Sequence, residues 1–78
     1  MKVNMGLLRL IASKIVPGSE LKVQDITTDK NKEKIDYELL RLEKQGFIKC
    51  MSRPFQGQTA VISILEITFA GEELLEAE

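Results

Sequence analysis

The stretch from residue 35 to residue 49 constrains the fold of this chain most strongly. Its first part carries one apolar stripe at helical spacing: Ile35, Leu39 and Leu42. Gly46 follows, and a glycine after a helix can adopt a left-handed conformation without a Cβ penalty. Apolar residues come directly after it. The stretch therefore predicts a helix that faces the core through these three side chains and turns at Gly46 into a β-strand.

The remaining pattern predicts an α+β domain that spans residues 1–78. Asn4 and Thr68 are suitable N-caps, and Pro17 with Gly18 ends the first helix. The expected elements, in order, are a helix over 5–16, an extended Leu21 or Lys22, a short helix over 23–27, a helix over about 30–45, a strand over 47–52, a hairpin loop over 53–58, a strand over 59–67 and a helix over 69–77. A domain of 78 residues has a small core and marginal stability.

Charge is distributed unevenly along the chain. Residues 1–56 hold all 11 Lys and Arg residues and 7 of the 12 acids, whereas residues 57–78 hold the other 5 acids and no Lys or Arg. Such asymmetry fits an anionic partner on one side and an acidic segment on the other, and it equally fits an ordinary solvated surface.

Composition argues against an enzyme. The chain has no His, which excludes histidine-based catalytic dyads and triads, and a single Cys50 leaves no ligand set for structural zinc and no internal disulfide. We therefore expect no cofactor and no small-molecule substrate, and a reducing, cytoplasmic location. No run of 18 apolar residues predicts a membrane span.

The order of predicted elements resembles a winged helix-turn-helix domain, in which three helices precede a two-stranded β-hairpin wing and a C-terminal helix. The similarity is clearest at Leu-Leu-Arg-Leu-Glu-Lys-Gln-Gly-Phe-Ile (39–48) and at Ile-Thr-Phe-Ala-Gly-Glu-Glu-Leu-Leu (67–75). The size and layout also resemble compact winged-helix proteins of the YjcQ type from bacterial prophage regions. The resemblance implies a transcriptional regulator that binds double-stranded DNA, with helix 30–45 as recognition helix and loop 53–58 as wing.

The candidate DNA-binding residues lie on the outward side of helix 30–45. At about 100° per residue, one stripe opposite the apolar side contains Lys30, Lys34, Tyr37, Arg41 and Lys44. Lys and Arg neutralise phosphates, and a tyrosine can contact a sugar or a thymine methyl. Glu33 interrupts the stripe, while Asp36 and Glu43 are placed on its flank. The same pattern also fits a helix face that carries cations only for solubility.

The predicted wing adds Arg53, for which the resemblance implies a DNA contact. Phe55 in the same loop is expected to fold back onto the core. The following strand is more apolar than one face of a hairpin needs, through Val61, Ile62, Ile64 and Leu65. This excess supports an alternative, a protein-interaction module or homodimer that uses the apolar hairpin and binds no DNA.

Overall fold

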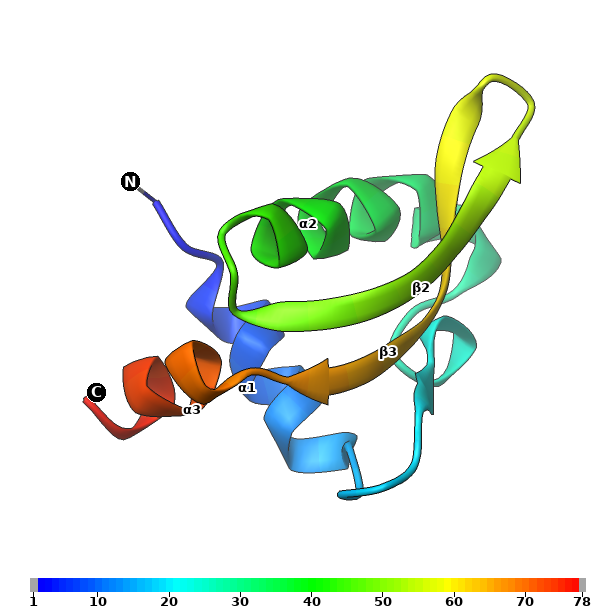
Figure 1. The fold of residues 1–78 in the computed structure, drawn as a ribbon. Helices are drawn as coiled ribbons and strands as arrows, with labels where there is room; N and C mark the ends of the chain where they lie inside the picture. The colour runs from blue at the N-terminus through cyan, green and yellow to red at the C-terminus, as the bar shows by residue number, and fades with distance from the viewer. Residues whose placement is uncertain (1, 78) are drawn as a thin grey trace.

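The computed structural model describes residues 2–77 and is α+β, with three α-helices and a three-stranded antiparallel sheet of order β1-β3-β2 (Figure 1). Its elements are α1 (Met5–Lys14), β1 (Leu21–Lys22), the 3₁₀ turns η1 (Val23–Asp25) and η2 (Asp29–Asn31), α2 (Lys32–Lys44), β2 (Ile48–Phe55), β3 (Gln58–Ile67) and α3 (Phe69–Glu76). The prediction of a sheet with only two strands is wrong, because Leu21 and Lys22 pair with Ile64 and Ser63 and add a third strand.

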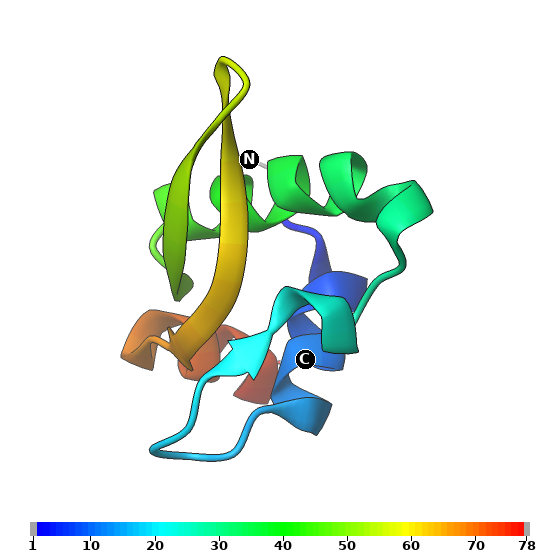
Figure 2. The same cartoon turned by 90° about the vertical axis from the view of Figure 1, so that its right-hand side faces the viewer.

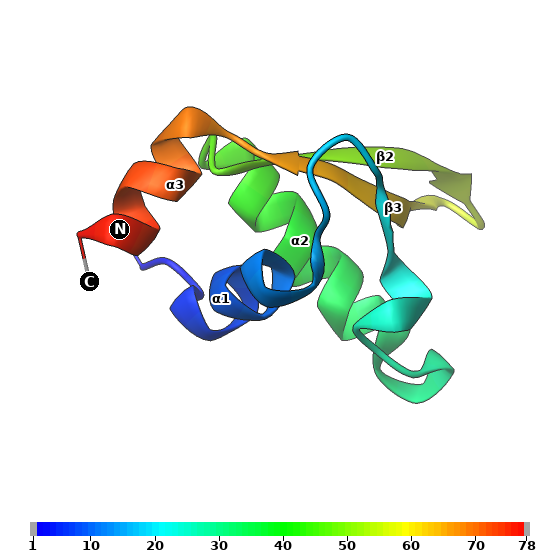
Figure 3. The same ribbon diagram turned by 90° about the horizontal axis from the view of Figure 1, so that it is seen from below.

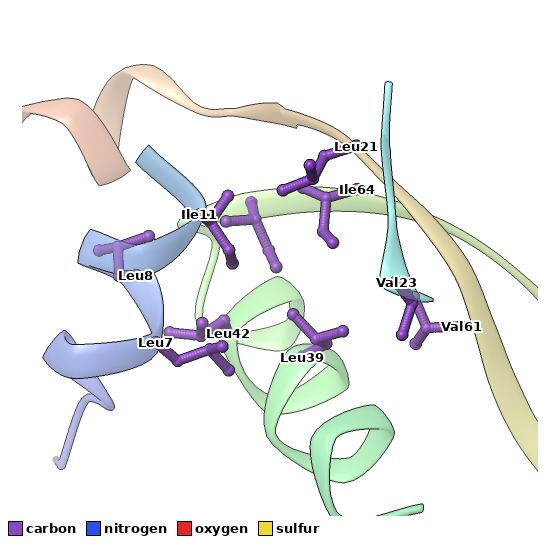
Figure 4. Packing of buried hydrophobic residues seen from close by; sticks show 10 residues of the cluster. Leu7, Leu8, Ile11, Leu21, Val23, Leu39, Leu42, Val61 and Ile64 are labelled. Atoms are coloured by element: carbon purple, nitrogen blue, oxygen red, sulfur yellow. The ribbon is translucent and has the colours of Figure 1, made fainter. Parts of the chain in front are cut away.

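Helices α1 and α2 cover one face of the sheet, and α3 lies at the end where β3 stops (Figure 3). The core fills the space between them. Figure 4 shows side chains from α1, β1, η1, α2 and β3 pointing into it. The buried apolar residues are Leu7, Leu8, Ile11, Leu21, Val23, Leu39, Leu42, Ile48, Val61 and Ile64. Within the described residues, no helix has the length and apolar character needed to cross a membrane.

Helix α1 follows the sequence pattern but is shorter than expected. The Oδ1 atom of Asn4 accepts a hydrogen bond from the backbone N–H of Leu7 at 3.0 Å. This bond confirms the prediction that Asn4 is the N-cap. The helix ends at Lys14, and Ile15 is already extended with ψ 136°. Pro17 explains the early end, because a proline disfavours helical conformation in the residue before it.

The expected second helix over 23–27 is only the single 3₁₀ turn η1, in which the N–H of Ile26 donates to the carbonyl of Val23 at 3.0 Å. A segment of one turn is too short for a helix to propagate, and forming the first helical turn alone is unfavourable in free energy. The next helix also begins differently from the prediction. Residues 29–31 form η2, and regular α-helical geometry starts at Lys32.

The end of α2 at Gly46 agrees with the prediction. Gly46 has φ 89°, its N–H donates to the carbonyl of Glu43 at 2.9 Å, and the N–H of Phe47 donates to the carbonyl of Leu42 at 3.1 Å. These two bonds make a Schellman motif, which needs a left-handed residue at the glycine position. The chain therefore leaves the helix in one fixed direction and enters β2 at Ile48.

The hairpin is longer than predicted, and segment 53–58 is not a loop. Both strands continue until Phe55 pairs with Gln58, which leaves Gln56 and Gly57 as the turn, with φ of 50° and 78°. Two positive φ values match the type I′ geometry favoured by two-residue hairpins. Pro54 does not break the strand, because β2 is the edge of the sheet and an edge strand tolerates a missing N–H.

Two irregularities bend β3. Lys49 pairs with Glu66 and Cys50 with Ile64, so the register skips Leu65. A second shift between Met51 and Ser52 skips Ile62 in the same way. An extra residue on one strand increases twist and bends that strand. The hairpin accordingly curves past the start of α2, and its tip projects from the body of the molecule (Figures 1 and 2).

Two helical glycines provide a matched test of packing. A Cβ built on Gly71 overlaps the carbonyl of Phe47 and comes within 2.7 Å of Ile67 Cγ2, whereas one on Gly6 meets only Asn4 Oδ1 at 3.7 Å. We expect Gly71→Ala to destabilise the fold by about 1–3 kcal/mol through overpacking. We expect Gly6→Ala to be neutral or stabilising by up to about 1 kcal/mol. Urea unfolding measures both, and equal effects would contradict the close packing of α3 on the Gly46–Phe47 turn.

Candidate nucleic-acid interface

The five stripe residues lie on or just before α2, and the structure leaves all of them exposed: Lys30, Lys34, Tyr37, Arg41 and Lys44. Lys30 belongs to η2 and the other four to α2. Tyr37 keeps 64% of its surface exposed, so its ring is not part of the core. The helix thus presents one aromatic side chain among four cations on the side away from the sheet.

The buried side of α2 is rotated from its expected position. Ile35 is only half-buried, whereas Leu39, Leu42 and Asp36 are buried. Asp36 was placed on a flank by the apolar pattern, because a carboxylate gives no apolar signal. In the structure its two oxygens accept hydrogen bonds from Lys32 Nζ at 2.7 and 2.8 Å. Lys32 Nζ also donates to the carbonyl of Val61 at 2.9 Å, which ties the start of α2 to β3.

A second carboxylate of α2 also faces the sheet. Glu43 Oε2 accepts a hydrogen bond from the N–H of Cys50 at 2.9 Å. Cys50 lies where the register of β2 and β3 shifts, so its N–H can leave the regular ladder. Carboxylate acceptors make stronger hydrogen bonds than neutral ones, and this one joins the last turn of α2 to β2.

These contacts separate the charges of α2. Of its four carboxylates, Asp36 and Glu43 bond toward the sheet and Glu38 is half-buried, with Oε1 accepting from Asn4 Nδ2 at 3.2 Å. Only Glu33 is exposed. The outward face therefore carries four cations and one carboxylate, and it is more strongly positive than the composition of the helix indicates.

Arg53 lies on a different surface from the stripe. With Asp29 and Lys32 it lines a groove of about 380 Å³ between the start of α2 and the hairpin, which we call the hairpin groove. Phe55 borders the same groove and is 53% exposed, so the expectation that it folds back onto the core is wrong. It lies beside the hairpin turn, away from the buried apolar residues of the core. None of the five stripe residues lines this groove.

Lys32 is the residue at this interface that the sequence pattern missed. It stands outside the predicted stripe, yet it borders the hairpin groove and holds Asp36. A usable signal was present, because Lys32 and Asp36 are four residues apart on one helix and such pairs lie side by side. The pattern could not show that this pair faces the sheet, since that depends on how α2 is rotated.

Cys50 is the one thiol among the described residues, and it is half-buried. Burial, together with the negative charges of Glu43 and Asp36, raises the pKa of the Cys50 thiol from 9.0 to about 12. A thiol with such a pKa is a poor nucleophile at neutral pH. Among residues 2–77, no group of three or more Cys, Asp or Glu side chains is arranged to hold a metal ion.

Comparisons with protein families, with curated proteins and with solved structures found no match for this chain. The functional argument therefore rests on the geometry of its own residues.

The Lys32–Asp36 pair can be tested through stability. Lys32→Met leaves the buried Asp36 carboxylate without its partner, and we expect a loss of about 1–3 kcal/mol in the free energy of unfolding. Lys34→Met is the matched control, because Lys34 is an exposed lysine of the same helix. Urea unfolding of the two variants gives the comparison. Equal stability of both would show that the pair does not hold α2 against β3.

Proposed function

We propose that this chain is a small DNA-binding protein of the winged-helix type, with α2 as its recognition helix and the β2–β3 hairpin as its wing. The observation that carries the proposal is the separation of charge on α2. Cations gather on the outward face, while Asp36 and Glu43 of the same helix bond inward and Glu33 stays exposed. A helix that enters a DNA groove needs this arrangement, since phosphates repel exposed carboxylates and attract Lys and Arg.

The hairpin supports the same proposal. Its segment from Ile48 to Leu65 contains no acidic residue, and it carries Lys49 and Arg53. Its tip presents Gln56 and Gln58, whose amides can donate to and accept from phosphates and base edges. Arg53 and Lys32 line the same hairpin groove, so the hairpin lies beside the start of α2, although none of the stripe residues lines that groove.

The passage from α2 into the β2–β3 hairpin and then into α3 supports the winged-helix proposal, whereas the second helix is a single 3₁₀ turn and the sheet has a third strand. A chain of 78 residues makes few DNA contacts alone, and we therefore propose that it binds as a homodimer. We further propose that the protein regulates transcription in the cytoplasm, in a bacterial or prophage setting.

DNA binding is tested with a fluorescently labelled duplex of mixed sequence. We expect the wild-type chain to bind at low salt, and Arg41→Ala with Lys44→Ala to weaken binding strongly, because two phosphate partners are lost. Each lost phosphate contact lowers the slope of log K against log salt by about 0.9, so we expect the slope to fall by about 2. Fluorescence anisotropy over a salt series measures both quantities.

Lys14→Ala with Lys22→Ala is the matched control. It removes the same charge from exposed positions at the end of α1 and in β1. An equal loss of affinity in the two double variants would mean that only net charge matters and that α2 is not the interface. Absence of any binding by the wild type at low salt would refute the proposal.

A second function is favoured by a specific observation on the hairpin. Met51, Phe55 and Ile62 are 45%, 53% and 41% exposed, which is unusual for large apolar side chains gathered on one element. Ile62 is one of the two residues skipped by the β2–β3 register. These residues support an alternative function, a protein-interaction or dimerisation module. Such a module would bind a partner protein or a second copy through the hairpin and would bind no DNA.

Self-association through the hairpin is tested by light scattering at micromolar concentration. We expect the wild type to form a dimer and Met51→Ser with Ile62→Ser to shift it to a monomer, because the association loses buried apolar area. Phe69→Ser is the control, since Phe69 is 77% exposed but lies outside the hairpin. A wild type that stays monomeric would exclude this surface as a homodimer interface.

A further inference from the structure

A groove of about 810 Å³ lies between the end of α1, the segment that leads into β1, the end of β3 and α3. It is produced by the shortness of β1. Strand β1 begins only at Leu21, opposite Ile64. The chain before it, through Pro17 and Gly18, does not follow β3, and Gly18 has φ 86°. Beyond Ile64 the β1 side of β3 therefore has no strand partner within the described residues, and the gap remains open.

Five large apolar side chains line this groove: Ile15, Val16, Leu65, Ile67 and Leu75. Val16 is 62% exposed and Leu65 is 40% exposed, so the groove is open to solvent. Leu65 is the second residue skipped by the β2–β3 register. The groove therefore offers exposed apolar surface to a partner.

The ionisable side chains that line the groove are all carboxylates: Glu20, Glu66 and Glu72. All three are exposed. Lys49 is the cross-strand neighbour of Glu66 and offsets part of its charge. The groove therefore combines negative charge with exposed apolar side chains.

We propose that this acidic groove binds a short peptide segment of a partner protein that carries an apolar side chain flanked by Lys or Arg. The apolar side chain would cover Val16 and Leu65, and the cations would pair with Glu20 and Glu72. Charge complementarity selects this occupant. A symmetric second copy would bring the same carboxylates face to face, which is destabilising, and an acidic segment would be repelled likewise.

The position of the groove allows a partner to bind while α2 is occupied. Helix α2 and the segment that leads into β1 lie at opposite sides of the molecule in two perpendicular views (Figures 1 and 2). The groove shares no lining residue with the hairpin groove. The inference is independent of the proposed DNA binding, because the two surfaces use different residues.

The test uses a fluorescein-labelled peptide in which leucine alternates with lysine, titrated with the full chain and followed by anisotropy. Two control peptides replace all lysines by glutamate or all leucines by serine. We expect the leucine–lysine peptide to bind and the controls to bind at least tenfold more weakly. Amide NMR shifts should change mainly over residues 12–20, 65–67 and 72–75, which locates the site without any substitution.

Two variants and two matched controls complete the experiment. We expect Val16→Ser with Leu65→Ser, and separately Glu20→Gln with Glu72→Gln, each to weaken the peptide about tenfold. Phe69→Ser and Glu73→Gln with Glu76→Gln change exposed apolar and acidic residues outside the groove and should leave binding unchanged.

Several results would overturn the proposal: no binding of the leucine–lysine peptide, equal binding of the glutamate peptide, or NMR shifts centred on another surface. Self-association that is lost in Val16→Ser with Leu65→Ser would identify a second copy as the occupant and would also overturn it. Loss of DNA binding in the α2 variants has no bearing on these outcomes, so failure of one proposal is distinguishable from failure of the other.

Discussion

The structure depends on the turn at Gly46 and on its attachment to the start of α3. The Schellman motif fixes the end of α2, and Thr68 holds the same turn from the other side of the hairpin. Thr68 Oγ1 donates to the carbonyl of Gly46 at 2.6 Å and accepts from the N–H of Gly71 at 3.1 Å, while its own N–H donates to the carbonyl of Phe47 at 2.9 Å. One threonine thus caps α3 and closes the hairpin onto the helix end, which aligns α2 with the sheet.

The alignment of α2 places polar groups where a small domain would be expected to place only apolar ones. Lys32, Asp36 and Glu43 connect the two ends of the helix to β3 and β2. Buried charge is costly unless it is paired and hydrogen-bonded, and each of these groups has a partner. These bonds orient the helix about its axis, and the same rotation that turns the carboxylates inward leaves Lys34, Tyr37 and Arg41 facing outward.

The uneven charge of the sequence becomes a separation in space. Cations dominate the outward face of α2, and Glu66 and Glu72 line the groove next to α3 together with Glu20. The third strand is essential for this arrangement, because β1 is long enough to complete the core but too short to cover the end of β3. The proposed DNA contact and the proposed peptide contact depend on this separation of charge.

The sequence by itself determined the local structure: the caps at Asn4 and Thr68, the end of α2 at Gly46, the two long strands and the exposure of the stripe on α2. These features depend on residues close together in the chain, which is why spacing and cap chemistry predict them.

Only the tertiary structure decided the rest. The pairing of Leu21 with Ile64 is long-range, the continuation of β2 through Pro54 depends on its being an edge strand, and the inward position of Asp36 depends on Lys32 and Val61 meeting it. Each of these requires a partner that is distant in the sequence, and no local pattern of residues specifies it.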